Sequence, residues 1–305
     1  MGSCFSQNIG HFFQQNRLDV LVNPFGTLFN PTSIASILER VAENRFFSPA
    51  DLTFYDGLFF CTDTYTAFSD TTEEGVLYRL NKELLDLRDY ISKSRAFFLT
   101  LGSSYIFRRV DNGQIVGNCH KLPGSFFTEE QMSPLDVANS LYSIHNTLRN
   151  LNPNLSVVVT ISPVRHLSLG AVKNTVSKSV LFSALSNVSA QCDWYYFPAY
   201  EMMMDEWRDY RFYQSDMIHP SDIALHLVTE RFMDTFFSQF EKDYFKISSD
   251  LLKLMLHKPR FKDMHSLYLR KEKAMRMRNE LNEKYHIDWE SVIKGWYDRE
   301  SKAIA

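Results

Sequence analysis

The sequence has few cysteines, no long apolar run and no large excess of charge of one sign. It holds only four cysteines in 305 residues and no CxxC pair, which argues against a disulfide framework and against a zinc or thioredoxin-like site. No apolar run approaches the roughly 18 residues that cross a bilayer, and the first residues do not read as a secretory leader. Basic residues are not in excess, because 33 Lys and Arg stand against 36 Asp and Glu. We therefore expect a cytoplasmic protein without nucleic acid or membrane partners.

The residues that are present indicate a packed α/β protein. Hydrophobic residues make up 45% of the chain and aromatic residues 14%, which is typical of a folded globular protein. Short apolar segments predict buried strands at residues 18–22, 96–101, 155–161 and 194–197. Helical periodicity predicts helices at residues 32–44, 72–92, 133–150, 173–190 and 221–244.

This alternation of strands and helices predicts a three-layer α/β/α fold with a mostly parallel sheet over residues 1–247. Residues 248–305 carry mixed charges between scattered apolar positions, and we expect them to form a solvated helical extension. A basic binding patch is the alternative for this part of the chain. In parallel sheets of this kind, functional groups collect on the loops beyond the carboxyl ends of the strands.

Polar motifs occur at several of the expected strand ends, and their order along the chain is informative. Nucleophilic side chains come early, and an Asp-x-x-His pair comes late. In chain order the motifs are Gly2-Ser3-Cys4-Phe5-Ser6, Asn23-Pro24-Phe25-Gly26-Thr27, Leu101-Gly102-Ser103-Ser104-Tyr105, Gly117-Asn118-Cys119-His120, Ser162-Pro163-Val164-Arg165-His166 and Asp216-Met217-Ile218-His219-Pro220.

This order of motifs resembles the GSCFA family, whose first motif reads GSCFS here, with Ser6 in place of the final Ala. NPFGTLFNP and DMIHPSD add to the resemblance, which covers about residues 2–245. The family is similar to SGNH (GDSL-like) hydrolases, so the resemblance implies a nucleophile just after the first strand. It places Cys4 at that position, with Ser3 and Ser6 as alternatives. A thiolate at a helix N-terminus attacks acyl carbons readily, although a small buried cysteine that only packs is also common.

The late motif supplies the acid–base pair that such a nucleophile needs. His219 is expected to take the proton of the nucleophile, and Asp216 is expected to hold the imidazole in the right tautomer. A pair at i and i+3 in one tight turn directs both side chains into one cleft. The alternative is a helix cap with a surface histidine.

The resemblance also implies donors for the oxyanion of the acyl intermediate. The backbone N–H of Cys4 and Gly26 match two of the SGNH donors, whereas Ser104 stands where that superfamily has Asn. Asn118 is expected to supply the missing amide, unless the Ser104 hydroxyl does so or Asn118 is an ordinary turn residue.

Three further side chains are expected to line the cleft. Arg165 and His166 follow a strand, and His120 belongs to the GNCH motif. A structural hydrogen bond or ion pair is the more common role for each of them. The spacing of these histidines with Cys119 does not favour a metal, and the proposed chemistry needs no cofactor.

The sequence thus predicts an esterase or acyltransferase that acts on a small-molecule or carbohydrate ester through a covalent acyl-enzyme. Carbohydrate O-acetyl groups are an inference from the superfamily alone. The rival is a non-catalytic module that keeps the cleft to bind a glycan or an acyl ligand.

One element of the pattern is missing, because Met1 stands where an apolar first strand should precede the nucleophile motif. We expect residues upstream of Met1 in the natural protein. That expectation also weakens the match of Met1–Ser6 to a myristoylation signal.

Overall fold

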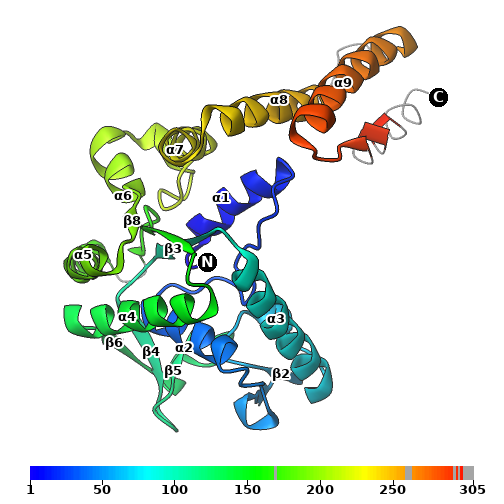
Figure 1. Cartoon of the computed structure of the whole chain (residues 1–305). Coiled ribbons are helices and arrows are strands. Elements are labelled where there is room, and N and C mark those ends of the chain that lie inside the picture. Colours follow the sequence, from blue (N-terminus) through cyan, green and yellow to red (C-terminus); the bar gives the residue numbers. More distant parts are fainter. Residues whose placement is uncertain (168–169, 258–262, 291–292, 295, 298–305) are drawn as a thin grey trace. The chain divides into compact units, whose positions relative to one another are not determined.

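The computed structural model describes residues 1–167, 170–257, 263–290, 293–294 and 296–297 (Figure 1). Its helices are α1 (Cys4–Gln15), α2 (Pro31–Ala42), α3 (Glu73–Lys93), α4 (Pro134–Leu151), α5 (Ala171–Cys192), α6 (Ala199–Glu201), α7 (Asp222–Phe236), α8 (Gln239–Leu256) and α9 (Met264–Tyr285). Its strands are β1 (Thr53–Tyr55), β2 (Leu58–Phe60), β3 (Ala96–Leu101), β4 (Tyr105–Arg109), β5 (Ile115–Val116), β6 (Phe127–Gln131), β7 (Ser156–Ile161) and β8 (Tyr195–Tyr196).

The centre of the fold is a parallel sheet with the strand order β3-β7-β8. These strands confirm the expected ones at 96–101, 155–161 and 194–197. The side chains of β3 and β7 are mostly buried, which explains why these two strands read as continuous apolar runs. On the free side of β3, Gly2 pairs in parallel with Thr100, and the Thr100 N–H donates to Met1 O at 3.0 Å. Met1 and Gly2 therefore pair with the edge of β3 through one bridge.

The strand expected at residues 18–22 is wrong. These residues form no strand, and their backbone is bonded to α1 instead. The Leu18 N–H donates to Phe13 O at 3.1 Å, and Val20 O accepts from the Gln14 side chain at 3.0 Å. Arg17, at a φ of +63°, turns the chain at the end of the helix. The apolar residues of this segment therefore lie against the end of α1 and do not join the sheet.

Two antiparallel sheets lie outside the predicted pattern. The strands β1 and β2 form a hairpin, and β5, β4 and β6 form a second sheet in the connection between β3 and α4. Their strands have two to five residues, and β6 is largely exposed. Such short and half-solvated strands carry too little periodicity to stand out in a sequence.

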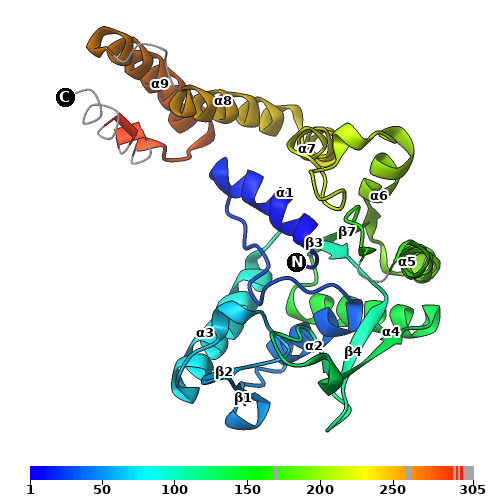
Figure 2. The ribbon, with the colours of Figure 1, turned by 180° about the vertical axis from the view of Figure 1, so that it is seen from behind.

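Four of the five expected helices are confirmed, because α2, α3, α4 and α5 match them within a few residues. These four helices lie on one side of the parallel sheet, and the first turns of α1 and α7 lie on the other side in both views (Figures 1 and 2). The starts of three of the four confirmed helices are fixed by polar caps: Asn30 caps α2, Thr72 caps α3, and Ser133 forms a capping box at α4.

The expected helix at 221–244 is wrong as a single element. It is two helices, because α7 ends at Phe236 and α8 begins at Gln239. Ser238 accepts from the Glu241 N–H, and the Glu241 carboxylate accepts from the Ser238 N–H, which completes a capping box. This Ser-x-x-Glu signal is a helix start inside an otherwise continuous helical pattern.

The chain divides into two compact units. The α/β unit comprises Met1–His11 and Leu21–Val228, and the helical unit comprises Phe12–Val20 and Thr229–Ala305. The boundary that we expected after residue 247 falls inside α8. Within the helical unit, the rings of Phe12 and Phe13 pack against Phe245, and Asn16 accepts from the Ser248 hydroxyl at 2.6 Å. No helix in the described parts of the chain is long and apolar enough to cross a membrane.

Candidate functional site

The nucleophile motif forms a tight turn between the edge of β3 and α1. Gly2 adopts a φ of +131°, and a Cβ at this position would lie 2.1 Å from Thr100 O. Only glycine therefore fits so close to β3. The Ser3 N–H donates to Thr100 O at 3.2 Å, which places Cys4 at the first position of α1.

Ser3 is the N-cap of α1 rather than a free nucleophile. Its side chain is only 1% exposed, and its hydroxyl lies 3.0 Å from Thr100 Oγ1 and accepts from the Phe5 N–H at 3.3 Å. The Ser6 hydroxyl is also buried and donates to Ser3 O at 2.7 Å. Among the three candidate nucleophiles, the geometry favours Cys4, which is partly exposed.

The environment of Cys4 contains opposing influences on its thiol. Burial raises the pKa of Cys4, whereas the N–H groups of Cys4 and Phe5 and the charge of Lys178 lower it. The start of a helix and a nearby ammonium group both stabilise a thiolate. Burial outweighs these two influences, so the net shift of the Cys4 pKa is upward and the thiol needs a base to take its proton.

Lys178 is the central residue that the sequence analysis missed. It lies on α5 and is 2% exposed, and its ammonium donates to Gly102 O at 2.7 Å and to Ser162 O at 2.8 Å. It therefore joins the turns that follow β3 and β7. Burial lowers the pKa of Lys178 to about 7, and the nearby Cys4 opposes this shift. A lysine on the buried stripe of α5 with Leu181 was a readable signal, because buried lysines are rare.

Asp216 and His219 form the pair that the sequence predicted. His219 Nδ1 lies 2.7 Å from Asp216 Oδ2, and Asp216 Oδ1 accepts from the N–H groups of Ile218 and His219. The hydrogen bond from the His219 ring holds the pKa of Asp216 at about 2. With Nδ1–H donated to Asp216, Nε2 is the ring atom left to accept a proton.

This turn lies at the same edge of the parallel sheet as Cys4. The Arg165 N–H, in the loop after β7, donates to Ile218 O at 3.4 Å, and the Arg165 guanidinium lies over the Tyr213 ring at 4.2 Å. Ser162, in the same loop, accepts from Lys178. In both views the segment that leads into α7 lies beside the start of α1 (Figures 1 and 2).

Two of the predicted oxyanion donors are already engaged within the protein. The Gly26 N–H donates to Asn23 O at 2.7 Å, and Ser104 is fully buried with its hydroxyl 3.2 Å from Ser177 Oγ. This geometry does not fit the expected roles of Gly26 and Ser104. Gly26 serves a turn instead, with a φ of +87° and a Cβ position 2.3 Å from the Tyr65 side chain.

The second motif has a clear structural task that sequence reasoning did not assign. Asn23 is buried, and its side-chain oxygen accepts from the Gly2 N–H and from the Ser6 hydroxyl, each at 3.0 Å. Its amide nitrogen donates to Ser3 O at 3.4 Å. Asn23 thereby fixes both ends of the nucleophile turn.

The remaining candidates have mixed surroundings. Asn118 accepts from the His120 N–H, and the His120 ring bonds to Cys61 O at 2.9 Å, so His120 holds a loop in place. Burial lowers the pKa of His120 and also that of His166, where the charge of Lys178 adds to the effect. His166 is half-buried near Lys178 and stays a candidate for the wall of the site. The roles of Asn118 and His166 remain predictions.

These features define an α/β protein whose candidate site lies at the carboxyl edge of a parallel sheet. The GSCFA family matches residues 1–232, and the chain belongs to that family. The match covers the α/β unit and ends inside α7. Searches of curated proteins and of solved structures find no match to this chain.

Proposed function

We propose that this protein hydrolyses or transfers O-acyl esters through a thioester on Cys4. The observation that carries the proposal is the setting of Cys4: a partly exposed thiol at a helix start, near the buried ammonium of Lys178. The Asp216–His219 pair at the same sheet edge supports it. The order of the motifs along the chain, which is similar to that of SGNH hydrolases, supports the same reaction class.

In the proposed reaction, His219 Nε2 takes the thiol proton and the sulfur of Cys4 bonds to the acyl carbon. The bond between this carbon and the ester oxygen then breaks, and the leaving alcohol takes the proton from His219. Water or a second hydroxyl, deprotonated by His219, attacks the thioester. The bond between the acyl carbon and the sulfur of Cys4 then breaks, which releases an acid or a new ester, and His219 returns its proton to the sulfur.

The residues around the sulfur have separable tasks in this reaction. The Cys4 N–H, at the start of α1, faces the developing oxyanion, and the helix dipole favours negative charge there. Asp216 keeps the ring of His219 in one orientation. Lys178 stabilises the thiolate and fixes the two strand-end turns beside it. An O-acetylated carbohydrate is the substrate class that we propose.

The test is turnover of p-nitrophenyl acetate by the full chain, combined with mass spectrometry of the trapped acyl-enzyme. We expect Cys4→Ala to abolish the acyl adduct and His219→Ala to slow turnover by about 10²–10⁴-fold. Cys119→Ala and His11→Ala are matched controls, since Cys119 is also partly exposed and His11 lies on the surface. Turnover that survives both site substitutions would remove the proposal.

A second function is favoured by one observation. The Gly26 N–H and the Ser104 hydroxyl are engaged within the protein, which leaves fewer donors for an oxyanion. A non-catalytic module that binds an acylated glycan is compatible with that arrangement. If the wild type binds an acetylated sugar but neither releases acetate nor becomes acylated, this second function replaces the first.

A further inference from the structure

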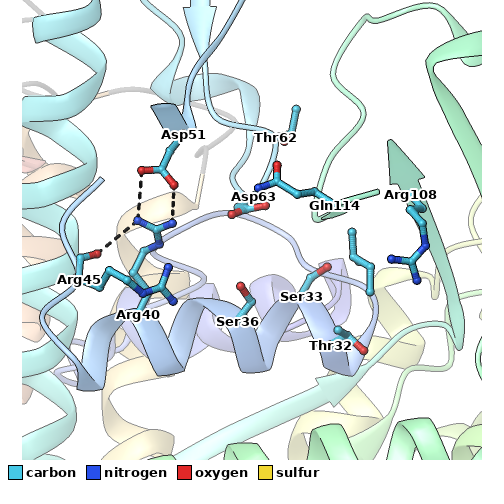
Figure 3. A pocket seen from close by; sticks show the side chains of 11 residues that line it. Thr32, Ser33, Ser36, Arg40, Arg45, Asp51, Thr62, Asp63, Arg108 and Gln114 are labelled. Carbon is cyan, nitrogen blue, oxygen red and sulfur yellow. Dashed lines mark hydrogen bonds and ion pairs between the residues drawn. The ribbon is translucent and has the colours of Figure 1, made fainter. Parts of the chain in front are cut away.

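A polar cavity of about 340 Å³ lies in the α/β unit, apart from Cys4 and its partners (Figure 3). One wall is α2, and the others come from the segment at Thr62 and Asp63 and from β4 and β5. Small-molecule sites in proteins start at about 300 Å³, so this cavity has the size for a ligand like a monosaccharide. Its lining is almost entirely polar, which is unlike a packing defect in an apolar core.

The cations of the cavity differ in how fully they are used. Arg40 is fixed, because its guanidinium bonds to Asp51 at 2.6 Å and also donates to backbone carbonyls (Figure 3). Arg45 pairs through Nε with the exposed Glu43, and among the described residues no partner is seen for its terminal nitrogens. Arg45 therefore retains the donors of its two terminal nitrogens, in the fork geometry that suits carboxylates and phosphates.

Arg108 lies on the opposite side of the cavity (Figure 3). Its Nε bonds to Glu130 at 3.0 Å, and its Nη1 donates to Gly113 O at 2.7 Å. Two of its three nitrogens are thus already occupied. Arg108 has less capacity left for an anion than Arg45.

Asp63 is the unusual group of the cavity. Figure 3 shows its carboxylate between Arg40 and Gln114, above Ser36. Within the described part of the chain, no hydrogen bond to this carboxylate is seen. Burial raises the pKa of Asp63. A half-buried carboxylate without a donor is costly unless a ligand or water supplies one. The hydroxyl groups of a sugar are such donors.

We propose that this cavity binds a small hydroxyl-bearing anion, of the class of sugar phosphates and sugar acids. The anionic group lies against Arg45, and the hydroxyl groups donate to Asp63 and bond to the hydroxyl of Ser36. Among the described residues that line the cavity, the terminal nitrogens of Arg45 and the carboxylate of Asp63 have no hydrogen-bond partner, and this pairing distinguishes the ligand from a bare anion, which Asp63 repels. The inference does not depend on the proposed ester chemistry, because none of its residues belongs to the Cys4 site.

Isothermal titration calorimetry on the full chain tests the proposal with four named probes. Glucose 6-phosphate and glucuronate represent the two sources of the anion. Glucose has the hydroxyl groups without the anionic group, and inorganic phosphate has the anionic group without the sugar hydroxyls. We expect at least one of the first two to bind at least tenfold more tightly than both glucose and phosphate. Equal affinity for phosphate, or no binding of either anionic sugar at millimolar concentration, overturns the proposal.

Three variants assign the binding to the cavity. Asp63→Asn is expected to weaken binding of the anionic sugar at least fivefold. The same variant should bind phosphate as tightly as the wild type or more tightly, because the carboxylate no longer repels it. Arg45→Gln is expected to weaken both, and Arg108→Gln is expected to have the smaller effect. Asp86→Asn, on the exposed face of α3, is the matched control. Circular dichroism confirms folding of each variant, and an affinity that Asp63→Asn and Arg45→Gln leave unchanged overturns the assignment.

Discussion

Two buried cations of the α/β unit are compensated in different ways. Arg40 is 6% exposed, bonds to the Asp51 carboxylate, and stacks at 4.2 Å over the ring of Phe47. Lys178 is 2% exposed, and its recorded hydrogen bonds go to the carbonyl oxygens of Gly102 and Ser162. Carbonyl dipoles solvate an ammonium only in part, whereas a carboxylate neutralises a guanidinium.

This difference indicates that the charge of Arg40, unlike that of Lys178, has a mainly structural role. Arg40 joins α2 to η1 (Pro49–Asp51), and its pair with Asp51 closes a capped turn. The charge on Lys178 is only partly compensated in the folded protein, since burial lowers the pKa of Lys178 to about 7. A buried titratable group with a shifted pKa is typical of functional sites, and Lys178 lies near Cys4, the nucleophile that we propose.

The largest expected effect is on the pH dependence of stability in Lys178→Met. Between pH 7 and about 10.5 the unfolded chain holds the Lys178 proton and the folded chain does not, so Lys178 makes stability rise with pH. Below pH 7 both states are protonated and the full cost, up to roughly 5 kcal/mol, is present. The free energy of unfolding of the variant should exceed that of the wild type most at pH 6, and the difference should shrink progressively toward pH 10.

Urea unfolding at several pH values measures this difference. Lys93→Met serves as the control, because Lys93 is an exposed lysine whose side chain is 72% accessible. Curves for wild type and Lys178→Met that run parallel from pH 6 to pH 10 would show that Lys178 titrates like an ordinary lysine.

Arg40→Met should have the opposite sign at neutral pH. It leaves Asp51 without its cation, and we expect a loss of about 2–4 kcal/mol, below the range for a fully buried pair because Asp51 is 23% exposed. Arg95→Met, at an exposed arginine, is the matched control in the same urea experiment. A stabilised Arg40→Met would abolish the contrast between the two cations.

A smaller effect is expected on the reactivity of Cys4. The Lys178 charge lowers the pKa of the Cys4 thiol, so Lys178→Met should slow alkylation by iodoacetamide several-fold below pH 7. Above pH 7 wild-type Lys178 is neutral, and the two rates should converge by about pH 9. Labelling of Cys119, measured by mass spectrometry in the same samples, should not change. A ratio of the two alkylation rates that does not change with pH would show that the charge of Lys178 does not affect the Cys4 thiol.

The smallest effect is expected for an exposed ion pair, which sets the lower end of the comparison. Lys93 Nζ lies 2.6 Å from Asp89 on α3, and both side chains are well exposed. Water screens this pair, so Lys93→Met should change the free energy of unfolding by less than about 0.5 kcal/mol. A thermal melt that shifts as far as that of Arg40→Met would mean that burial is not what separates these cations.

Much of the α/β unit was readable from the chain because its elements carry local signals. The strands β3 and β7 are continuous apolar runs, and the starts of α2 and α4 are marked by Asn30 and by Ser133 with its capping partner. The segment at 18–22 has the same apolar composition as a strand, yet it closes the end of α1. Composition alone does not distinguish these two uses of buried apolar residues.

The candidate site was readable only in part. The Asp216–His219 bond joins residues three apart, so a local motif was sufficient to predict the contact. Lys178 meets Gly102 across 76 positions of the chain, and Asn23 meets the nucleophile turn across 21. Such contacts depend on how α5 and the second motif dock on the sheet, which no local pattern encodes.

The sequence by itself determined the starts of α2, α3 and α4, the two long buried strands and the local Asp216–His219 turn, because each rests on residues within a few positions of one another. The tertiary structure decided that Cys4 is accessible while Ser3 is a buried cap, and that Lys178 reaches the turns beside the thiol. It also decided that Asp63 faces a cavity with Arg45 nearby. These outcomes depend on burial and on charges brought together from distant positions, since the dielectric surroundings of a side chain are set by the folded chain.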